Sequence, residues 1–191
     1  MNGQEVAAGA LPGIVAGSAV DRLARLFDVH YARLYRLARR MAPSTDDALD
    51  LVQETFLKAA RFPKSIPFGV ANEEAWLVRV LINIRRDQWR RTSARNRHDR
   101  TAIEGGRAAK SGGDPEAALI ARNAIWQALD ALAPRRRAIV VMVELEGLGI
   151  PAIASLLGIS VVTVRWHLSR GRRELTGALK TYMGGSDERK K

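Results

Sequence analysis

The chain has 191 residues, and 31 lysines and arginines against 20 aspartates and glutamates give it a net charge of +11 at pH 7. This length suits one large domain or two small ones, and the charge favours a polyanionic partner. Cysteine is absent and the three histidines lie far apart in the sequence, so we expect no disulfide, no metal site and no cofactor.

Residues 1–19 are predicted to be a flexible leader. Their apolar part lies in LPGIVAGSAV, which no basic residue precedes and which glycine and proline interrupt. A signal peptide has a basic start and an unbroken apolar run, so none is expected. No other segment is apolar over a membrane-spanning length. We therefore expect a cytoplasmic protein without membrane insertion.

Helical periodicity begins near Val20, and Pro43 ends the first predicted helix. Ser44 and Thr45, followed by two aspartates, resemble a capped, acid-rich helix start. A second helix is therefore predicted over about 46–61. The apolar faces are Phe27, Tyr31, Leu34, Ala38 and Met41 in the first helix, and Ala48, Val52, Phe56 and Ala59 in the second.

The other side of the second helix carries Asp50, Gln53 and Leu57 at steps of three and four. One apolar residue among polar ones on an exposed face is commonly incidental. The same pattern also fits a docking surface for another protein, so the residues alone leave both interpretations open.

A loop and a long basic helix follow. Residues 62–72 contain two prolines and a glycine, which favours a loop, and a helix is predicted from Glu73 to about Arg95. Leu77, Leu81 and Ile84 form its inner stripe, and another face carries Trp76, Arg79, Asn83, Arg86 and Arg90. Guanidinium groups that follow phosphates and a ring that stacks on bases suit single-stranded DNA. The alternative is a solvated basic helix with the tryptophan in the core.

Glycine pairs and mixed charges at 98–114 predict a linker. Asp114, Pro115 and Glu116 then begin a helix whose apolar side is Leu119, Ile125, Leu129 and Leu132. Pro134 opens the next helix, and Gly147 ends it.

Residues 153–175 have the pattern of a helix-turn-helix. Gly158 can adopt the left-handed turn, Ile159 fills the corner, and the hydroxyl of Ser160 can cap the second helix. The buried positions of the two helices are Ile153, Ala154, Leu157, Val164, Leu168 and Leu175.

The outward stripe of the second helix is basic. A helix with arginines on its solvent face can enter a major groove, bind phosphates and reach base edges. The alternative is an ordinary helical hairpin with a solvated basic face. The stripe consists of Val162, Arg165, Trp166, Ser169, Arg170 and Arg173.

The positive charge lies in two regions. Residues 76–100 carry eight arginines and two aspartates, and residues 116–191 carry twelve basic and seven acidic residues. Two basic regions that are separate in sequence indicate two contacts with a polyanion.

Taken in order, three segments resemble those of the extracytoplasmic-function sigma factors, the small class of the sigma-70 superfamily of bacterial RNA polymerase subunits. DALDLVQETFLKA at 47–59 resembles the helix that docks on the polymerase clamp. AWLVRVLINIRRDQWRR at 75–91 resembles the helix that receives the promoter's minus-ten element, and residues 129–175 resemble the domain that binds the minus-thirty-five element.

The resemblance implies roles for individual residues. Asp50, Gln53 and Leu57 would bind the polymerase, and residues 62–70 would capture a flipped base. Trp166 and His167 depart from the family, which usually has smaller or basic residues there. The implied minus-ten set is Trp76, Arg79, Asn83, Arg86, Asp87 and Arg90, and the minus-thirty-five set is Ser160, Thr163, Arg165, Trp166, Ser169, Arg170 and Arg173.

The predicted fold is all-α, with two small helical domains joined by a flexible linker, the second domain being the helix-turn-helix. The predicted divisions are a leader (1–19), a docking and minus-ten domain (20–97), a linker (98–114), a minus-thirty-five domain (115–183) and a tail (184–191).

The resemblance implies a sigma factor that binds core RNA polymerase and promoter DNA, both duplex and single-stranded. Many relatives are held inactive by an anti-sigma factor, so such a factor is a candidate partner. The alternative, a helix-turn-helix regulator that acts without polymerase, leaves the clamp-like and strand-binding segments unexplained. An enzyme is not expected, because the sequence has no phosphate-binding glycine loop and no nucleophile with a matching base.

Overall fold

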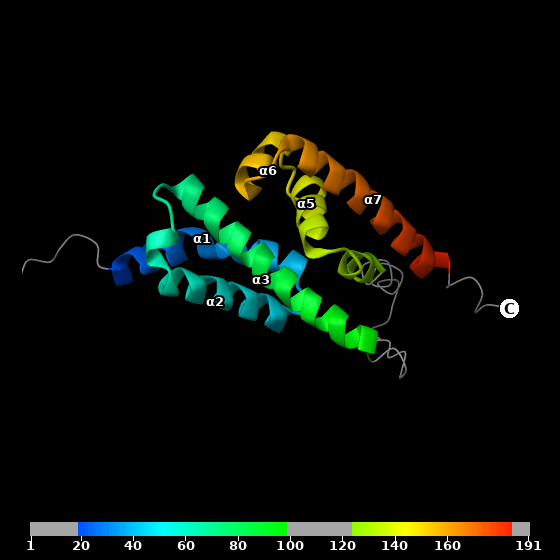
Figure 1. Cartoon of the computed structure of the whole chain (residues 1–191), viewed down its shortest axis with the longest axis horizontal. Coiled ribbons are helices and arrows are strands. Elements are labelled where there is room, and N and C mark those ends of the chain that lie inside the picture. Colours follow the sequence, from blue (N-terminus) through cyan, green and yellow to red (C-terminus); the bar gives the residue numbers. More distant parts are fainter. Residues whose placement is uncertain (1–18, 99–123, 185–191) are drawn as a thin grey trace, which may run out of the picture.

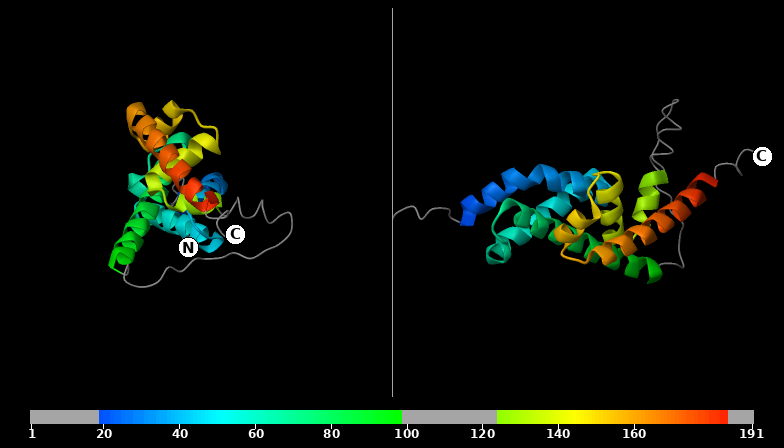
Figure 2. Two further views of the ribbon diagram at one scale, coloured as in Figure 1. Left: turned by 90° about the vertical axis from the view of Figure 1, so that its right-hand side faces the viewer. Right: turned by 90° about the horizontal axis from the view of Figure 1, so that it is seen from above.

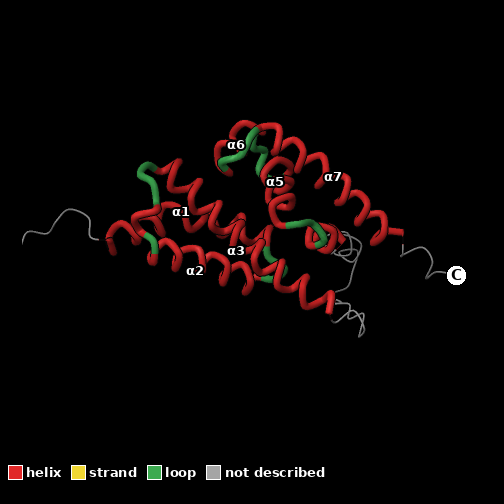
Figure 3. Tube along the Cα trace, in the orientation of Figure 1, coloured by secondary structure: helices red, strands yellow, loops and turns green. Residues whose placement is uncertain are grey.

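Every regular element that the structure describes is a helix. The computed structural model describes residues 19–98 and 124–184 (Figure 1). Helices and loops alone make up these residues (Figure 3), so the predicted all-α fold is confirmed. The helices are α1 (Ala19–Met41), α2 (Thr45–Arg61), the 3-10 helix η1 (Pro63–Ser65), α3 (Val70–His98), α5 (Pro134–Glu144), α6 (Ile150–Leu157) and α7 (Val161–Gly184), and residues 124–130 are also helical.

Three of the predicted divisions lie almost wholly outside the described residues. These are the leader, the linker and the tail, of which the structure describes only residues 19, 98 and 184. The first part of the helix expected from Asp114, including Leu119, also lies outside them. The exact domain boundaries therefore stay a prediction.

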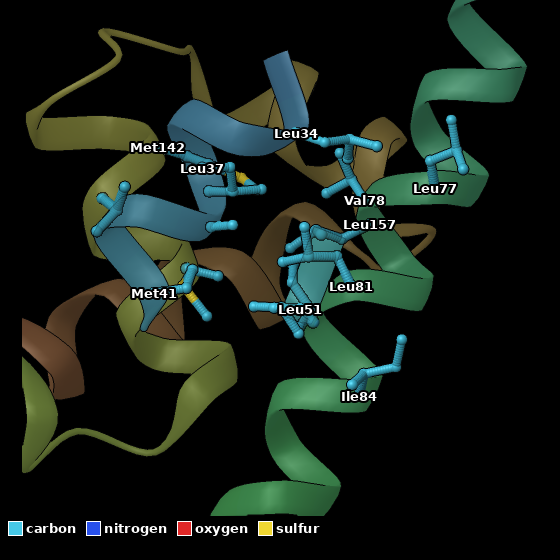
Figure 4. Close-up of a cluster of buried hydrophobic side chains, with 14 of the residues drawn as sticks. Leu34, Leu37, Met41, Leu51, Leu77, Val78, Leu81, Ile84, Met142 and Leu157 are labelled. Atoms are coloured by element: carbon cyan, nitrogen blue, oxygen red, sulfur yellow. The ribbon is translucent and has the colours of Figure 1, made fainter. Parts of the chain in front are cut away.

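Helices α1, α2 and α3 pack around a leucine-rich core. The hydroxyl of Ser44 caps α2 as predicted, accepting a 3.0 Å hydrogen bond from the amide of Asp47. Leucines from all three helices meet in one apolar cluster (Figure 4). Burial of one such side chain contributes roughly 1.5–3 kcal/mol to stability. The fully buried leucines of α1, α2 and α3 are Leu26, Leu34, Leu37, Leu51, Leu77 and Leu81.

Two residues that the sequence placed in the core lie at the surface. Phe27 is 43% exposed, and its ring stacks on Tyr31 and lies tilted against Phe56, so it lies at the edge where α1 meets α2. Ile125 is 47% exposed, because the buried face of its helix is centred on Ala124 and Ala128. In both cases the other described residues of the predicted face are buried or half-buried, so Phe27 and Ile125 lie at the edges of correctly predicted faces.

Helix α3 begins three residues earlier than the sequence predicted. Gly69, with a φ of 95°, reverses the chain, and its carbonyl accepts a 2.9 Å hydrogen bond from the amide of Glu73. The carboxylate of Glu73 is 1% exposed and lies 3.1 Å from the guanidinium of Arg25 and 3.6 Å from the imidazole of His30. A buried carboxylate needs such partners, so this cluster fixes the start of α3 against α1.

Helices α6 and α7 form the predicted helix-turn-helix. Gly158 has a φ of 65° and ends α6, and the hydroxyl of Ser160 accepts a 3.1 Å hydrogen bond from the amide of Thr163. Pro134 occupies the first turn of α5, as expected. Of the residues predicted to be buried, Ile153, Ala154, Leu157, Val164 and Leu168 are buried, and Leu175 is partly buried against the core.

The two predicted domains pack directly against each other, which the sequence did not indicate. Figure 2 shows α5, α6 and α7 beside the α1–α3 group from two directions. Met142 of α5 and Leu157 of α6 belong to the same apolar cluster as the leucines of α1–α3 (Figure 4). The carboxylate of Glu146, which follows α5, accepts hydrogen bonds from Arg33 (2.8 Å) and Arg40 (3.3 Å) of α1. The interface therefore combines an apolar core with ion pairs.

The contact between α5 and α7 depends on one glycine, which yields a stability prediction. A Cβ at Gly171 would lie 2.7 Å from Cγ2 of Val140, and valine has little rotamer freedom with which to move away. Alanine normally stabilises a helix interior by about 1 kcal/mol relative to glycine. We expect Gly171→Ala instead to lower the free energy of unfolding by about 1–3 kcal/mol through overpacking.

Gly177 of the same helix is the matched control, because no atom beyond its chain neighbours and its own stretch of helix backbone lies within 4 Å of its Cβ position. Gly177→Ala should raise the midpoint of urea unfolding, followed by circular dichroism, whereas Gly171→Ala should lower it. Equal midpoints for the two variants would contradict the packing argument.

Candidate polymerase-docking and DNA-binding surfaces

The three residues predicted to bind polymerase share the outer face of α2. Asp50, Gln53 and Leu57 are all exposed, and Leu57 is 48% exposed. Gln53 and Leu57 also line a groove of about 340 Å³ between α1 and α2. Leu57 is therefore part of a larger apolar surface. The groove is lined by Leu23, Phe27, Tyr31, Leu49, Val52, Gln53, Phe56, Leu57 and Ala60.

The groove has an aromatic wall that sequence reasoning did not identify. The ring centroid of Phe27 lies 4.7 Å from that of Tyr31 and 5.0 Å from that of Phe56. Stacked rings of this kind give a rigid apolar surface. The signal that could have identified it is the run of aromatic residues at steps of four in α1, which was assigned to the core.

The predicted minus-ten stripe of α3 is covered at one end and exposed at the other. Trp76 is half-buried and packs against the apolar core, which favours the core alternative for this residue. The guanidinium of Arg79 donates a 3.0 Å hydrogen bond to the carbonyl of Leu156 in α6. Further along, Arg90 is exposed, and Asn83, Arg86 and Asp87 are partly exposed.

The loop before α3 is held in place by Arg22 of α1. Its guanidinium donates to the carbonyls of Ile66 (2.8 Å), Pro67 (3.1 Å) and Pro63 (3.3 Å). The same guanidinium lies 4.2 Å from the ring centroid of Phe68, which is 78% exposed. Arg22 thus fixes the backbone of the loop and supports a solvent-facing ring. No pattern in the sequence links this arginine to a loop more than 40 residues away.

The outward face of α7 is exposed as predicted. Arg165, Trp166, Ser169, Arg170 and Arg173 all lie at the surface. Ser160 and Thr163 are at the start of the helix, where their hydroxyls lie 2.8 Å apart. Capping therefore occupies both hydroxyls in this structure.

His167 lies beside this face, and its surroundings favour the neutral imidazole. Burial, together with the nearby guanidinium groups of Arg135 and Arg136, lowers the pKa of His167 below its ordinary value. An imidazole that is already mostly neutral at pH 7 becomes more so. The basic character of the face comes from arginines.

Two further findings concern the described residues as a whole. No group of three histidine, aspartate or glutamate side chains among them is placed to hold a metal ion. No single described helix is long and apolar enough to cross a membrane, and only α6 and α7 taken together, bent by 108°, reach that length and composition.

Comparison with known proteins places both halves of the chain in one family. The family model for sigma-70 region 2 matches residues 26–95, and that for sigma-70 region 4 matches residues 122–175. The sigma factor SigM of Mycobacterium tuberculosis is 32% identical over 168 residues, which cover 87% of this chain and 82% of SigM. The chain therefore belongs to the extracytoplasmic-function sigma factors of the sigma-70 family.

Two further relatives and one solved structure are also sigma factors. SigE of Mycolicibacterium smegmatis is 35% identical over 164 residues, and the match spans 80% of this chain but 60% of SigE. SigW of Bacillus subtilis is 26% identical over 170 residues, covering 84% of this chain and 90% of SigW. The solved sigma factor RpoE of Bartonella quintana, in complex with the anti-sigma factor NepR, shares the fold with a TM-score of 0.56 and 24% identity, covering 84% of this chain and 97% of RpoE.

The comparisons give the chain its class. It is an RNA polymerase sigma factor for transcription initiation, from a family that is not catalytic. They do not assign roles to individual residues, which the geometry must support.

Proposed function

We propose that the α2 face and the α1–α2 groove bind core polymerase, that α3 and the loop before it bind the minus-ten element, and that α7 binds the minus-thirty-five element. The observation that carries the proposal is the separation of an apolar docking groove in one domain from an exposed arginine face in the other. A subunit that bridges polymerase and duplex DNA needs both surfaces at once. Such a subunit acts where polymerase and promoters are, in the bacterial cytoplasm.

An anti-sigma factor is a further proposed partner. RpoE, which has the fold of this chain, was solved in complex with the anti-sigma factor NepR. The α1–α2 groove supports the proposal, because exposed apolar side chains gather in it and can bind a partner. An occupant of this groove would compete with polymerase.

The docking proposal predicts a selective loss of polymerase binding. We expect Asp50→Lys combined with Gln53→Ala to weaken binding to core polymerase at least several-fold in a competition assay. Both side chains are exposed, and exposed substitutions change stability by about half a kcal/mol or less. Folding should therefore survive.

Glu144→Lys is the control, because Glu144 is exposed, lies in the other domain and pairs only with the exposed Arg172 among the described contacts. This variant makes the same charge reversal and should keep wild-type affinity. If the variant of Asp50 and Gln53 binds core polymerase as tightly as the wild type does, the outer face of α2 is not the polymerase-binding surface.

The loop proposal predicts a melting defect in a variant of α1. We expect Arg22→Ala to release the carbonyls of Ile66 and Pro67 and to lower the rate of open-complex formation on a duplex promoter. A promoter with a pre-opened bubble should restore much of that rate, because the loop then has no duplex to open. Permanganate footprinting of unpaired thymines measures the open fraction.

Arg25→Ala is the matched control. Arg25 lies one turn further along α1 and bonds Glu73, but it makes no described contact with the loop. If both arginine variants slow melting equally, the effect comes from the start of α3 and the loop assignment fails.

We propose that single-stranded DNA bound along the whole α3 stripe displaces α6, because α6 packs against the part of the stripe that contains Arg79. Glu146 joins the domains by accepting hydrogen bonds from Arg33 and Arg40, and its side chain is only 10% exposed. We expect Glu146→Gln to weaken this contact, since it keeps the shape of the side chain but removes its charge. The variant should then bind a minus-ten oligonucleotide more tightly than the wild type.

Glu74→Gln is the control, because Glu74 pairs with the same Arg33 within one domain. The chain has no cysteine, so dyes at Glu54→Cys and Ser155→Cys can report the separation of the domains. Energy transfer should fall for Glu146→Gln only. Equal oligonucleotide affinity for the two glutamine variants would contradict a role for the interface.

A further inference from the structure

Trp166 on α7 lies within cation–π distance of two guanidinium groups. Its side chain is 52% exposed. The guanidinium carbon of Arg170, one turn further along α7, lies 5.9 Å from the ring centroid, and that of Arg136, from α5, lies 5.8 Å away. Both distances are within the range of cation–π attraction. The ring is therefore exposed to solvent but restricted in orientation.

Glu174 joins the two arginines. The guanidinium of Arg136 lies 2.8 Å from both carboxylate oxygens of Glu174, and Nε of Arg170 donates to one of them at 3.2 Å. Four side chains from two helices thus form one cluster, which we call the tryptophan clamp: Arg136, Trp166, Arg170 and Glu174. The carboxylate neutralises one of two positive charges, so the clamp retains a net charge of +1.

The backbone around Gly171 brings Arg136 to this position. The Cβ position of Gly171 lies 3.6 Å from Cβ of Arg136, so α5 and α7 are in close contact at that level. Arg136 therefore reaches the outer face of α7 from a neighbouring helix. The sequence did not single out this residue or Glu174, because neither lies on the outward stripe of α7.

An exposed indole ring has a specific use in a major groove. The groove displays hydrogen-bonding groups and one apolar group, the thymine methyl, and apolar side chains recognise that methyl. A ring held in one orientation loses little conformational entropy on contact. The arginines use only part of their donors on Glu174, which leaves donors for phosphate oxygens beside the ring.

We propose that the tryptophan clamp reads a thymine methyl group in the upstream promoter element, with Trp166 as the contacting ring, Arg136 as an added phosphate contact and Glu174 as a positioning residue. This inference rests on the proposed binding of the minus-thirty-five element by α7. It adds a residue of α5 to the DNA interface and specifies one base.

The experiment uses the full chain bound to core polymerase. The preferred upstream element is first selected from promoters randomised in that region. Each thymine of the selected element is then replaced by deoxyuridine, which removes the methyl group and keeps the hydrogen-bonding groups. We expect one replacement to weaken wild-type binding about fourfold, as for loss of one buried methyl group.

Variants of the clamp should change this discrimination in different ways. Trp166→Ala should bind the thymine and deoxyuridine promoters equally, and Trp166→Phe should keep part of the difference. Glu174→Gln should bind all promoters more tightly, because it removes a negative charge, yet should discriminate less. A purely electrostatic role for Glu174 would raise affinity and leave the discrimination intact.

Arg136→Gln should reduce both the discrimination and the salt dependence of binding. Arg135→Gln is its matched control, with the same change of charge one residue earlier and outside the clamp, and it should keep the discrimination. Circular dichroism confirms that each variant is folded.

Two failures are distinguishable. If the wild-type complex selects an upstream element but no deoxyuridine replacement weakens binding, or if Trp166→Ala discriminates as the wild type does, the clamp does not read a methyl group. If the wild-type complex selects no upstream element at all, the proposed role of α7 fails, and the present inference fails with it.

Discussion

The buried guanidinium of Arg137 is the constraint on which the arrangement of the two domains depends. Its side chain is 2% exposed, its Nε donates a 2.7 Å hydrogen bond to the carbonyl of Arg40 at the end of α1, and it pairs with Asp130. Burial lowers the pKa of Arg137, but arginine stays charged in proteins, so its charge must be compensated. Arg85 of α3 donates in the same way to Met41. The last carbonyls of α1, which have no partner within the helix, thus hold α3 and α5 together.

A consequence of this arrangement is that one surface of α3 serves two contacts. Arg79 bonds a carbonyl of α6, and the same residue belongs to the stripe proposed to bind single-stranded DNA. Arg79 keeps further donors, but a DNA strand bound along the whole stripe would take the place of α6, so the two contacts compete. A ligand shifts such an equilibrium only by its difference in affinity for the two states. Under the proposed binding of DNA along the whole stripe, polymerase and promoter contribute the free energy that separates α6 from α3.

The features that were predicted correctly from the sequence are those that depend on residues close together in the chain. The turn at Gly158, the caps at Ser44 and Ser160 and the start at Pro134 depend on residues within a few positions, and the structure confirms them. Periodicity identified apolar faces but not their neighbours, so Phe27 was assigned to the core although it forms the wall of a groove. The contacts of Arg22 and Arg137 join residues 41 to 97 positions apart. No local pattern encodes such pairs, and for the same reason Arg136 was not among the candidate DNA-binding residues.

The two proposed DNA-binding surfaces differ in how much rearrangement they need before they can contact DNA. On α7 the arginines and Trp166 are exposed, and Arg136 and Glu174 already restrict the orientation of the ring, so duplex DNA can be contacted without a change of fold. On α3 the first part of the stripe packs against the core and α6. Contact with a duplex upstream element therefore requires less rearrangement than capture of a melted strand. During initiation the promoter is first bound as a duplex and then opened. The α7 surface, which is proposed to contact the duplex, is accessible first, and the α3 surface, which is proposed to bind the melted strand, becomes accessible later.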